Sequence, residues 1–223
     1  MTSAQTYFDR HARAFDRVYE GGVVNRLLRP GPGHGRDLAA SVVARHPDAR
    51  ILDVGCGPGR VAEAVLLVGA SGYVGIDISP RMLDLARRRL SHFDAIELLE
   101  GDFLAADVPG RFDVVLALGL FDYVTEPARA AAWLHARCSS TLVASFTRRD
   151  PLKAPIRRLR YRIGGVPVVD YTEAGVQALL RGAGFRRIEV PFQGRRGFHA
   201  VAAASAVTPL TDEDRARPAT VAY

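Results

Sequence analysis

The sequence has 223 residues, 48% of them apolar, and its mean hydropathy is +0.02. These values are typical of a single globular domain that can bury a sizeable core. Because no run of about 18 apolar residues occurs and the polar stretch 1–5 opens the sequence, we predict neither a membrane span nor a signal peptide, and we expect a cytoplasmic protein.

The net charge of +6 and the pI near 9.8 raise the question of a nucleic-acid partner. All but one of the thirty basic residues are arginine, the exception being Lys153. Such a bias, together with abundant Ala, Gly and Val, is more typical of a GC-rich genome than of selection for phosphate contacts. Nucleic-acid binding is therefore disfavoured, because charge alone is weak evidence. The two cysteines are too few for a disulfide scaffold, and no metal site is predicted.

The first 45 residues predict two helices. Between Ser3 and Tyr19 the aromatic and apolar residues recur at helical spacing, which indicates an amphipathic helix. This helix either packs on the core or covers a binding site, and the sequence leaves both alternatives open. The run Gly-Pro-Gly-His-Gly at 31–35 predicts a break in the chain. A second helix is expected over Arg36–Arg45, leading into the first strand.

A buried strand followed by glycines dominates the next stretch. Residues Arg50–Val54 are short, apolar and β-branched, as expected of a parallel strand buried on both faces. Three glycines follow at alternate positions: Gly55, Gly57 and Gly59. A helix from Arg60 would point its free N–H groups at a ligand. Arg60 stands where a dinucleotide fingerprint has its third glycine, and Asp53 would repel a pyrophosphate but attract a sulfonium or ammonium, so a dinucleotide is disfavoured.

The second strand, Tyr73–Asp77, ends in an acidic residue about 20 positions after the glycines. In nucleoside-binding α/β folds a carboxylate at this place accepts hydrogen bonds from both ribose hydroxyls. The alternative is that Asp77 caps the following helix, but Ser79 and Pro80 already supply a cap and a first helical residue. We therefore favour the ribose interpretation.

Two further strands repeat the arrangement. Ile96–Glu100 is followed at once by Gly101, Asp102 and Phe103, and Phe112–Leu118 by Gly119. Carboxyl ends of parallel strands meet at one edge of a sheet, where such sheets bind ligands. The three aspartates should therefore surround one crevice: Asp53, Asp77 and Asp102.

This ordered set resembles the class I S-adenosylmethionine-dependent methyltransferases, whose first motif is similar to the stretch 53–59. The resemblance implies an α/β, Rossmann-like sheet of seven strands in the order 3-2-1-4-5-7-6, with strand 7 antiparallel and helices on both faces. A fifth strand over Ser140–Phe146 and a hairpin of Phe185–Pro191 with Phe198–Ala203 supply the remaining strands. The cofactor is then S-adenosylmethionine and the product S-adenosylhomocysteine. The residues implied for cofactor binding are Asp53, Gly55, Cys56, Gly57, Gly59, Asp77, Ile78, Met82, Gly101, Asp102, Phe103, Leu118 and Gly119.

The resemblance also suggests how the chain is divided. Residues 1–45 would cover the cofactor site, residues 46–204 would form the core, and residues 205–223 a flexible tail. Within the core, 148–171 would be a lid insertion. Its segment 148–162 carries seven basic residues against one acidic residue. The alternatives there are a helix with a solvated basic face, or a lid that offers arginines to an anionic acceptor.

Absent motifs narrow the acceptor. The chain lacks the Asn/Asp-Pro-Pro-Tyr/Phe clamp of amino-group methylation, an attacking cysteine near the crevice, and the acid cluster that holds magnesium in catechol-type enzymes. A small-molecule acceptor remains, methylated most often on oxygen, and residues 118–124 and 145–152 are weakly similar to magnesium-protoporphyrin O-methyltransferases. The alternatives are an RNA-binding or RNA-modifying methyltransferase and a cofactor-binding regulator without catalysis.

The acceptor pocket is predicted from segments that belong at the carboxyl edge of the sheet or over it. Together they would form an aromatic slot with a cationic end, suited to a planar and even an anionic metabolite. A base is needed only if the acceptor arrives protonated, and His11 is the candidate placed best for it. The residues predicted for acceptor binding are Tyr7, Tyr19, Phe121, Tyr123, Arg157, Tyr161 and Tyr171.

Overall fold

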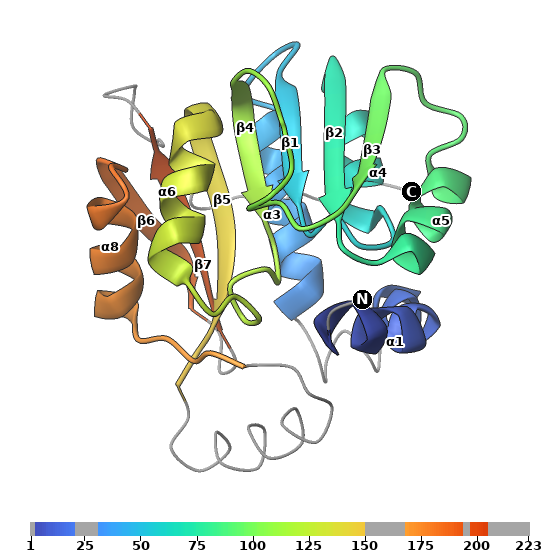
Figure 1. Ribbon diagram of the computed structural model, residues 1–223. Coiled ribbons are helices and arrows are strands. Elements are labelled where there is room, and N and C mark those ends of the chain that lie inside the picture. Colours follow the sequence, from blue (N-terminus) through green and yellow to red (C-terminus); the bar gives the residue numbers. More distant parts are fainter. Residues whose placement is uncertain (1–2, 21–30, 150–167, 194–196, 205–223) are drawn as a thin grey trace.

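The computed structural model of the protein describes residues 3–20, 31–149, 168–193 and 197–204 (Figure 1). Helices and strands alternate along most of this part of the chain, as in other α/β folds. The helices are α1 (Ser3–Glu20), α3 (Gly31–Val43), α4 (Arg60–Leu67), α5 (Pro80–Arg89), α6 (Pro127–Arg137) and α8 (Glu173–Gly182). The strands are β1 (Arg50–Val54), β2 (Gly72–Asp77), β3 (Ile96–Glu100), β4 (Phe112–Ala117), β5 (Cys138–Thr147), β6 (Arg187–Gln193) and β7 (Gly197–Ala203).

The strands form one seven-stranded sheet in the order β3-β2-β1-β4-β5-β7-β6. The first five strands pair in parallel, whereas β7 is antiparallel to both β5 and β6. The predicted strand order and the antiparallel seventh strand are therefore confirmed. The strand order reverses between β1 and β4, which is the place where open α/β sheets leave a crevice at their carboxyl ends.

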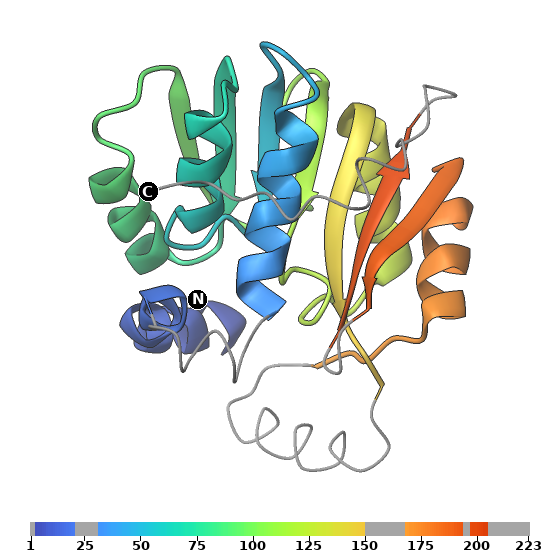
Figure 2. The ribbon, with the colours of Figure 1, turned by 180° about the vertical axis from the view of Figure 1, so that it is seen from behind.

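Each face of the sheet is covered by its own group of helices (Figures 1 and 2). Apolar residues of α3, α4 and α5 pack on one face around Ile51 and Tyr73. Those of α6 and α8 pack on the other face around Leu52 and Phe146. Next to β2 and β3 this second face is covered by the segment 101–111, which buries Phe103 there.

The start of α3 differs from the prediction. The 31–35 run does not break the chain but forms the first residues of α3, which begins at Gly31. A proline near the start of a helix gives up an N–H that has no intrahelical partner in any case, so the helix can include it. A Cβ atom at Gly35 would lie 2.9 Å from Nε2 of His199 on β7, so a glycine allows α3 to pack closely on the sheet.

The predicted division of the chain can be followed only in part. In the predicted covering region 1–45, α1 lies below the carboxyl edge of the sheet, whereas α3 is part of the layer on one sheet face (Figures 1 and 2). At the ends of the predicted lid, Arg148 forms an isolated bridge with Tyr171. Residues 150–167 and 205–223 lie outside the described residues, so the lid and the flexible tail stay predictions. Within the described part of the chain, no helix combines the length and the apolar character needed to cross a membrane.

Gly59 fixes the distance between α4 and α5. It has φ +79 at the N-cap of α4, a conformation that costs other residues energy because of their Cβ. A Cβ at this position would also lie 3.2 Å from both Cα and Cβ of Ala86 on α5. The glycine thus meets two constraints at once, one of backbone conformation and one of packing.

These two constraints can be separated by two glycine-to-alanine changes. Gly69 also has a positive φ, +102, but open space surrounds the place of its Cβ. We expect Gly69→Ala to lower the free energy of unfolding by about 1 kcal/mol through backbone strain alone. Gly59→Ala should cost at least about 1 kcal/mol more, because α5 must also shift. Urea unfolding followed by circular dichroism measures both, and equal losses would contradict the packing role of Gly59.

Candidate active site

A cavity of about 580 Å³ opens at the carboxyl ends of the strands around the point where their order reverses. Its volume lies within the range of small-molecule and cofactor sites. The residues that line it come from the glycine turn, from the ends of β1 to β4 and from α1. They include Phe8, Asp53, Gly55, Cys56, Gly57, Pro58, Arg60, Asp77, Ile78, Met82, Gly101, Asp102, Phe103, Leu104, Leu118, Gly119, Leu120, Asp122, Tyr123, Thr125 and Glu126.

The glycine turn forms the floor of this cavity. The N–H groups of Gly55 and Cys56 both donate to the carbonyl oxygen of Ile76, at 2.8 and 3.1 Å, which joins the end of β1 to the end of β2. Gly57 has φ +53, and a Cβ added there would meet nothing within 4 Å. The backbone of the turn is therefore open to a ligand in the cavity.

Asp77 connects this turn to the start of α5. Its Oδ2 accepts from the N–H of Gly57 at 2.8 Å, and its Oδ1 accepts from the N–H of Ser79 at 2.9 Å. Burial raises the pKa of Asp77 above its ordinary value, while the two N–H donors act in the opposite direction. Each carboxylate oxygen has a second lone pair, so the side chain can still accept hydrogen bonds from a ligand.

Asp53 lies behind the turn in a buried polar pair. It is 2% exposed and accepts a hydrogen bond from the hydroxyl of Tyr73 at 2.8 Å. Burial raises its pKa to about 7, against the opposing effect of the Tyr73 hydrogen bond. Burial also raises the pKa of the Cys56 thiol, and the charges of Asp77 and Asp53 add to this effect. A positive charge in the cavity would favour the ionised form of Asp53.

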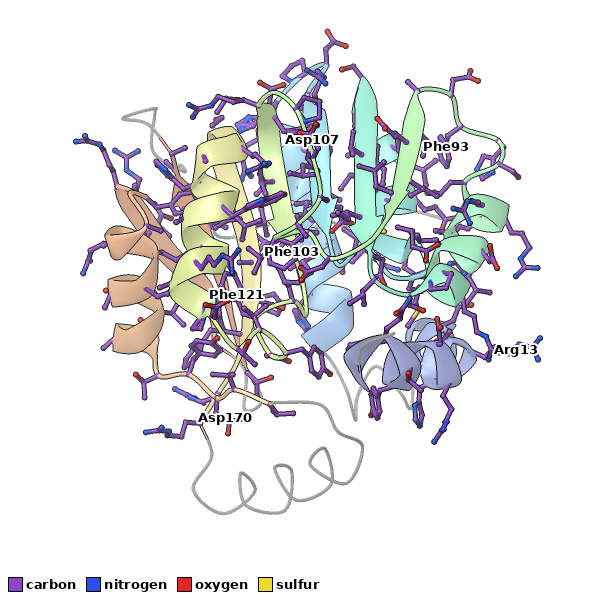
Figure 3. All side chains as sticks on the ribbon, in the orientation of Figure 1. Arg13, Phe93, Phe103, Asp107, Phe121 and Asp170 are labelled. Carbon is purple, nitrogen blue, oxygen red and sulfur yellow. The ribbon has the colours of Figure 1, made fainter. Side chains whose placement is uncertain are left out.

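The end of β3 supplies a polar and an aromatic wall. Asp102 is exposed at the cavity, and its Oδ1 accepts from the N–H of Leu104 at 3.0 Å. Phe103 is 9% exposed and points its ring toward α6, where it contacts Trp133 edge to face at a centroid distance of 5.2 Å (Figure 3). A flat apolar ligand ring would therefore meet one aromatic side chain and one hydrogen-bond acceptor.

Helix α1 lies across the carboxyl edge and is fixed there by two acidic residues. Asp9 accepts from the hydroxyl of Ser79 at 2.5 Å. Asp16 accepts from Arg60 and from Arg89, at 3.0 Å each, and the three side chains are 14–19% exposed. Arg60 itself lines the cavity. The opposite side of the helix faces away from the protein, as Arg13 shows in Figure 3.

Phe8 brings α1 into contact with the end of β4. It lines the cavity, and its ring meets that of Tyr123 edge to face at a centroid distance of 5.0 Å. Leu118, Gly119 and Leu120 line the same side of the cavity. The two aromatic rings therefore form one continuous apolar part of the cavity wall.

Twelve of the thirteen residues predicted for cofactor binding line this one cavity. The exception is Gly59, which packs against α5 instead. Of the residues predicted for acceptor binding, Tyr123 lines the cavity as expected. Arg157 and Tyr161 lie outside the described residues, and so does the side chain of Tyr19, so their roles stay predictions.

Four other predicted residues lie away from the cavity. Phe121 is fully buried, stacks on Phe146 at 4.6 Å and lies in the core on the α6 side (Figure 3). Tyr171 joins the same aromatic group, and its hydroxyl donates to the Phe121 carbonyl at 3.0 Å. Tyr7 and His11 pair with each other on α1, with rings 4.4 Å apart, and Nδ1 of His11 donates to the Tyr7 carbonyl at 2.8 Å. Their helix turns Phe8 into the cavity in their place.

The lining residues that the prediction did not include are led by Phe8, Arg60 and Asp122, whose side chains bear on the chemistry of the cavity. Helical geometry could have indicated Phe8, because it shares an apolar face with Ala12, which is buried. The sequence places Arg60 at the start of a helix and in the position of a third glycine, but neither observation indicates where its side chain points. Asp122 stands in an irregular segment between two aromatic residues, where no periodicity shows which side chain faces inward.

Comparison with known proteins agrees with this geometry. Residues 51–139 match the family model described as a methyltransferase domain. The chain is 31% identical over 153 residues to the ubiquinone biosynthesis O-methyltransferase of Xanthomonas campestris pv. campestris (strain B100), covering 66% of this chain and 63% of that protein. It is 33% identical over 147 residues to the magnesium-protoporphyrin O-methyltransferase of Rhodobacter capsulatus, covering 61% and 65%. Its fold matches that of magnesium protoporphyrin IX methyltransferase from Synechocystis PCC 6803, with a TM-score of 0.70 and 21% identity over 91% of this chain and 98% of that one.

Residues 51–139 of this chain form a methyltransferase domain of the class I S-adenosylmethionine-dependent type. The aligned stretches span less than two thirds of the first curated relatives, namely 37% of the ubiquinone biosynthesis O-methyltransferase of Thiobacillus denitrificans and 63% of the Xanthomonas protein. In this methyltransferase domain the matched residues 51–139 include every residue listed above as lining the cavity except Phe8.

The contacts of Asp16 give a first prediction about the site. An Asp16→Ala change removes the carboxylate that Arg60 and Arg89 share, and removing one partner of an ion pair of low exposure is costly. We expect amide hydrogen exchange in α1 to become at least about tenfold faster, with no change in β1 and β2. The matched control is Asp84→Ala, which removes an ion pair with Arg87 whose side chains are both more than half exposed. Unchanged exchange in α1 of the Asp16 variant would contradict the anchoring role.

Asp53 gives the free energy of unfolding a pH dependence. Its pKa is about 7 in the folded protein and about 4 in an unfolded chain. Between these values the folded protein binds more protons, so the contribution of Asp53 to stability falls as the pH rises from about 4 to 7. Asp53→Asn keeps an oxygen that can accept from Tyr73 but cannot ionise. Urea unfolding should therefore show the variant gaining stability relative to wild type between pH 5 and pH 8, by at most about 4 kcal/mol. A difference that does not change with pH would show that Asp53 is not protonated in this range.

Proposed function

We propose that this protein transfers a methyl group from S-adenosylmethionine to a small-molecule acceptor, and that the methylated atom is an oxygen. One observation carries the proposal: Asp53, Asp77 and Asp102, each at the end of a successive strand, line one cavity together with the glycine turn. The similar proteins from Xanthomonas and Rhodobacter are both named O-methyltransferases, which supports transfer to oxygen.

The cavity residues fit the proposed cofactor in their chemistry. Asp77 would hold the ribose hydroxyls, since its carboxylate is fixed by two N–H groups and has lone pairs left over. Asp102 would accept from the adenine amino group, with Phe103 against the ring. Asp53 would face the positively charged part of the molecule, and the open backbone at Gly57 would allow its close approach.

When it is bound, the cofactor supplies a methyl group on a positively charged sulfur, which is already a good leaving group. The main task of the protein is then to position the two reactants. Positioning can lower the activation barrier by about 7–11 kcal/mol without any nucleophilic side chain. Phe8 and Tyr123 form a wall that limits the directions of approach to the cavity. Helix α1, held by Asp9 and Asp16, excludes water from the same side.

The proposal predicts that S-adenosylhomocysteine binds and that Asp77 is needed for it. Calorimetric titration of wild type should give a dissociation constant in the micromolar range. Asp77→Ala should weaken binding by roughly 10- to 100-fold, since about 1.5–3 kcal/mol of charged hydrogen bonds is lost. Asp107→Ala should bind like wild type, because this exposed side chain lies at the opposite edge of the sheet from α1 (Figure 3).

The same two proteins test the transfer itself. Wild type should pass label from S-adenosylmethionine carrying a labelled methyl group to the small-molecule fraction of a cell extract, and Asp77→Ala should do so far less. Label that appears in RNA instead would favour the nucleic-acid alternative. Affinity that is unchanged in Asp77→Ala would remove the proposed cofactor site.

A further inference from the structure

We propose that Asp122 binds the reacting group of the acceptor. It selects a reacting group that can donate a hydrogen bond, namely a hydroxyl or an amine, over a carboxylate. This inference rests on the proposed function, because it assigns the side of the cavity that the cofactor leaves open. Asp122 lines the cavity beyond the end of β4, next to Tyr123. It lies outside the glycine turn and outside the strand ends that carry the other three aspartates.

Asp122 is held in place from several directions. Its Oδ1 accepts from the N–H of Thr147 at 2.9 Å, and its Oδ2 accepts from the hydroxyl of the same residue at 2.7 Å. Its carbonyl oxygen accepts from the N–H of Val169 at 2.9 Å, and the Thr147 carbonyl accepts from the N–H of Tyr171 at 2.8 Å. The carboxylate is thus fixed between the end of β4, the end of β5 and the 168–171 segment. A fixed carboxylate on rigid elements is the arrangement that orients a reacting group well.

The charges along the cavity favour a hydrogen-bond donor as acceptor. Five carboxylates line it, from Asp53, Asp77, Asp102, Asp122 and Glu126. Among the described residues that line the cavity, Arg60 supplies the only positive side chain, and Asp16 already pairs with it. Glu126 pairs with Arg129 on the surface. An acceptor that is itself a carboxylate would meet like charges here, whereas a hydroxyl or an amine would meet an acceptor of hydrogen bonds.

The role of Asp122 in the reaction is proton removal. As the acceptor oxygen or nitrogen forms its new bond to the methyl carbon, the carbon–sulfur bond breaks and its electron pair stays on sulfur. The hydrogen of the acceptor leaves as a proton to a carboxylate oxygen of Asp122, and water then takes that proton. Atoms and charge balance without an oxidant, a reductant or a metal ion. Geometry supports this assignment over His11, which lies outside the cavity lining.

Two small planar probes test the selection. Catechol offers two hydroxyl groups and benzoate offers a carboxylate, and both have one aromatic ring. Saturation-transfer NMR titrations on the full chain with saturating S-adenosylhomocysteine should show that wild type binds catechol more tightly than benzoate. Asp122→Asn should bind catechol roughly tenfold more weakly or worse, and benzoate more tightly than wild type does. Asparagine can still accept from the N–H of Thr147 and donate to its hydroxyl, so the local fold should survive.

Asp170→Asn is the matched control. Asp170 lies on the neighbouring 168–171 segment and does not line the cavity, so its variant should keep the probe preference of wild type (Figure 3). If Asp122 had a purely structural role, the Asp122→Asn variant would bind both probes more weakly or melt at a lower temperature. It would still bind catechol more tightly than benzoate. That outcome would overturn the inference, as would a wild type that binds benzoate at least as tightly as catechol or that binds neither probe.

Calorimetry on the same samples tests the proposed function separately. If wild type does not bind S-adenosylhomocysteine in calorimetry, the proposed function fails and the inference fails with it. If S-adenosylhomocysteine binds but catechol does not bind more tightly than benzoate, only the inference about Asp122 fails. Thermal unfolding of the two asparagine variants shows whether any change reflects loss of fold.

Discussion

The site depends on one carboxylate that is shared by two chain segments. Asp77 accepts from the N–H of Gly57 in the turn after β1 and from that of Ser79 at the start of α5. Neither N–H has an intrahelical partner, and a buried donor without a partner is costly. One side chain therefore satisfies both segments and at the same time sets the distance between them. Because the donors point at the carboxylate, they also favour its charged form and act against burial, which raises the pKa of Asp77.

The same few residues connect the glycine turn, which forms the floor of the cavity, to helix α1. Ser79 accepts from the N–H of Met82 as the cap of α5, and with its own hydrogen it binds Asp9 of α1. Arg89 donates to Asp16 of α1 and to the Pro58 carbonyl in the glycine turn. If α1 moves away, the cap and the turn lose partners as well. The position of α1 and the order of the glycine turn are thus linked through shared hydrogen-bond partners.

Individual residues explain which parts of the fold and of the site could be predicted from the sequence. Parallel strands buried on both faces are short apolar runs, and an aspartate or glycine at their ends marks a sheet edge, so the strands and Asp77 could be located from local pattern. Gly59 followed the same pattern but serves packing against Ala86, a contact between α4 and α5 that no local pattern contains. Phe121 illustrates the opposite limit, since an aromatic residue after a strand can turn either to the core or to the cavity. Only tertiary packing decides which.

Irregular segments and helix starts were the hardest to predict for a similar reason. A Gly-Pro-Gly run normally breaks the chain, yet the run at 31–35 forms the start of α3, because packing of the helix against the sheet outweighs its low helix propensity. Asp122 could not be distinguished from its aromatic neighbours, because its position follows from bonds to Thr147, 25 residues away. In each case the deciding contact joins segments that are distant in the sequence.

The electrostatics of the cavity follow from the same arrangement. With a pKa of about 7, Asp53 is close to half protonated at neutral pH, and the buried hydroxyl of Tyr73 satisfies one of its oxygens in either state. Repulsion from Asp77 contributes to this raised pKa, although burial is the larger cause. A cation that enters the cavity offsets that repulsion and lowers the pKa of Asp53, so its binding is linked to release of part of a proton. Asp53 is thus partly neutral while no cation is present, and it ionises more fully when a positive charge enters the cavity.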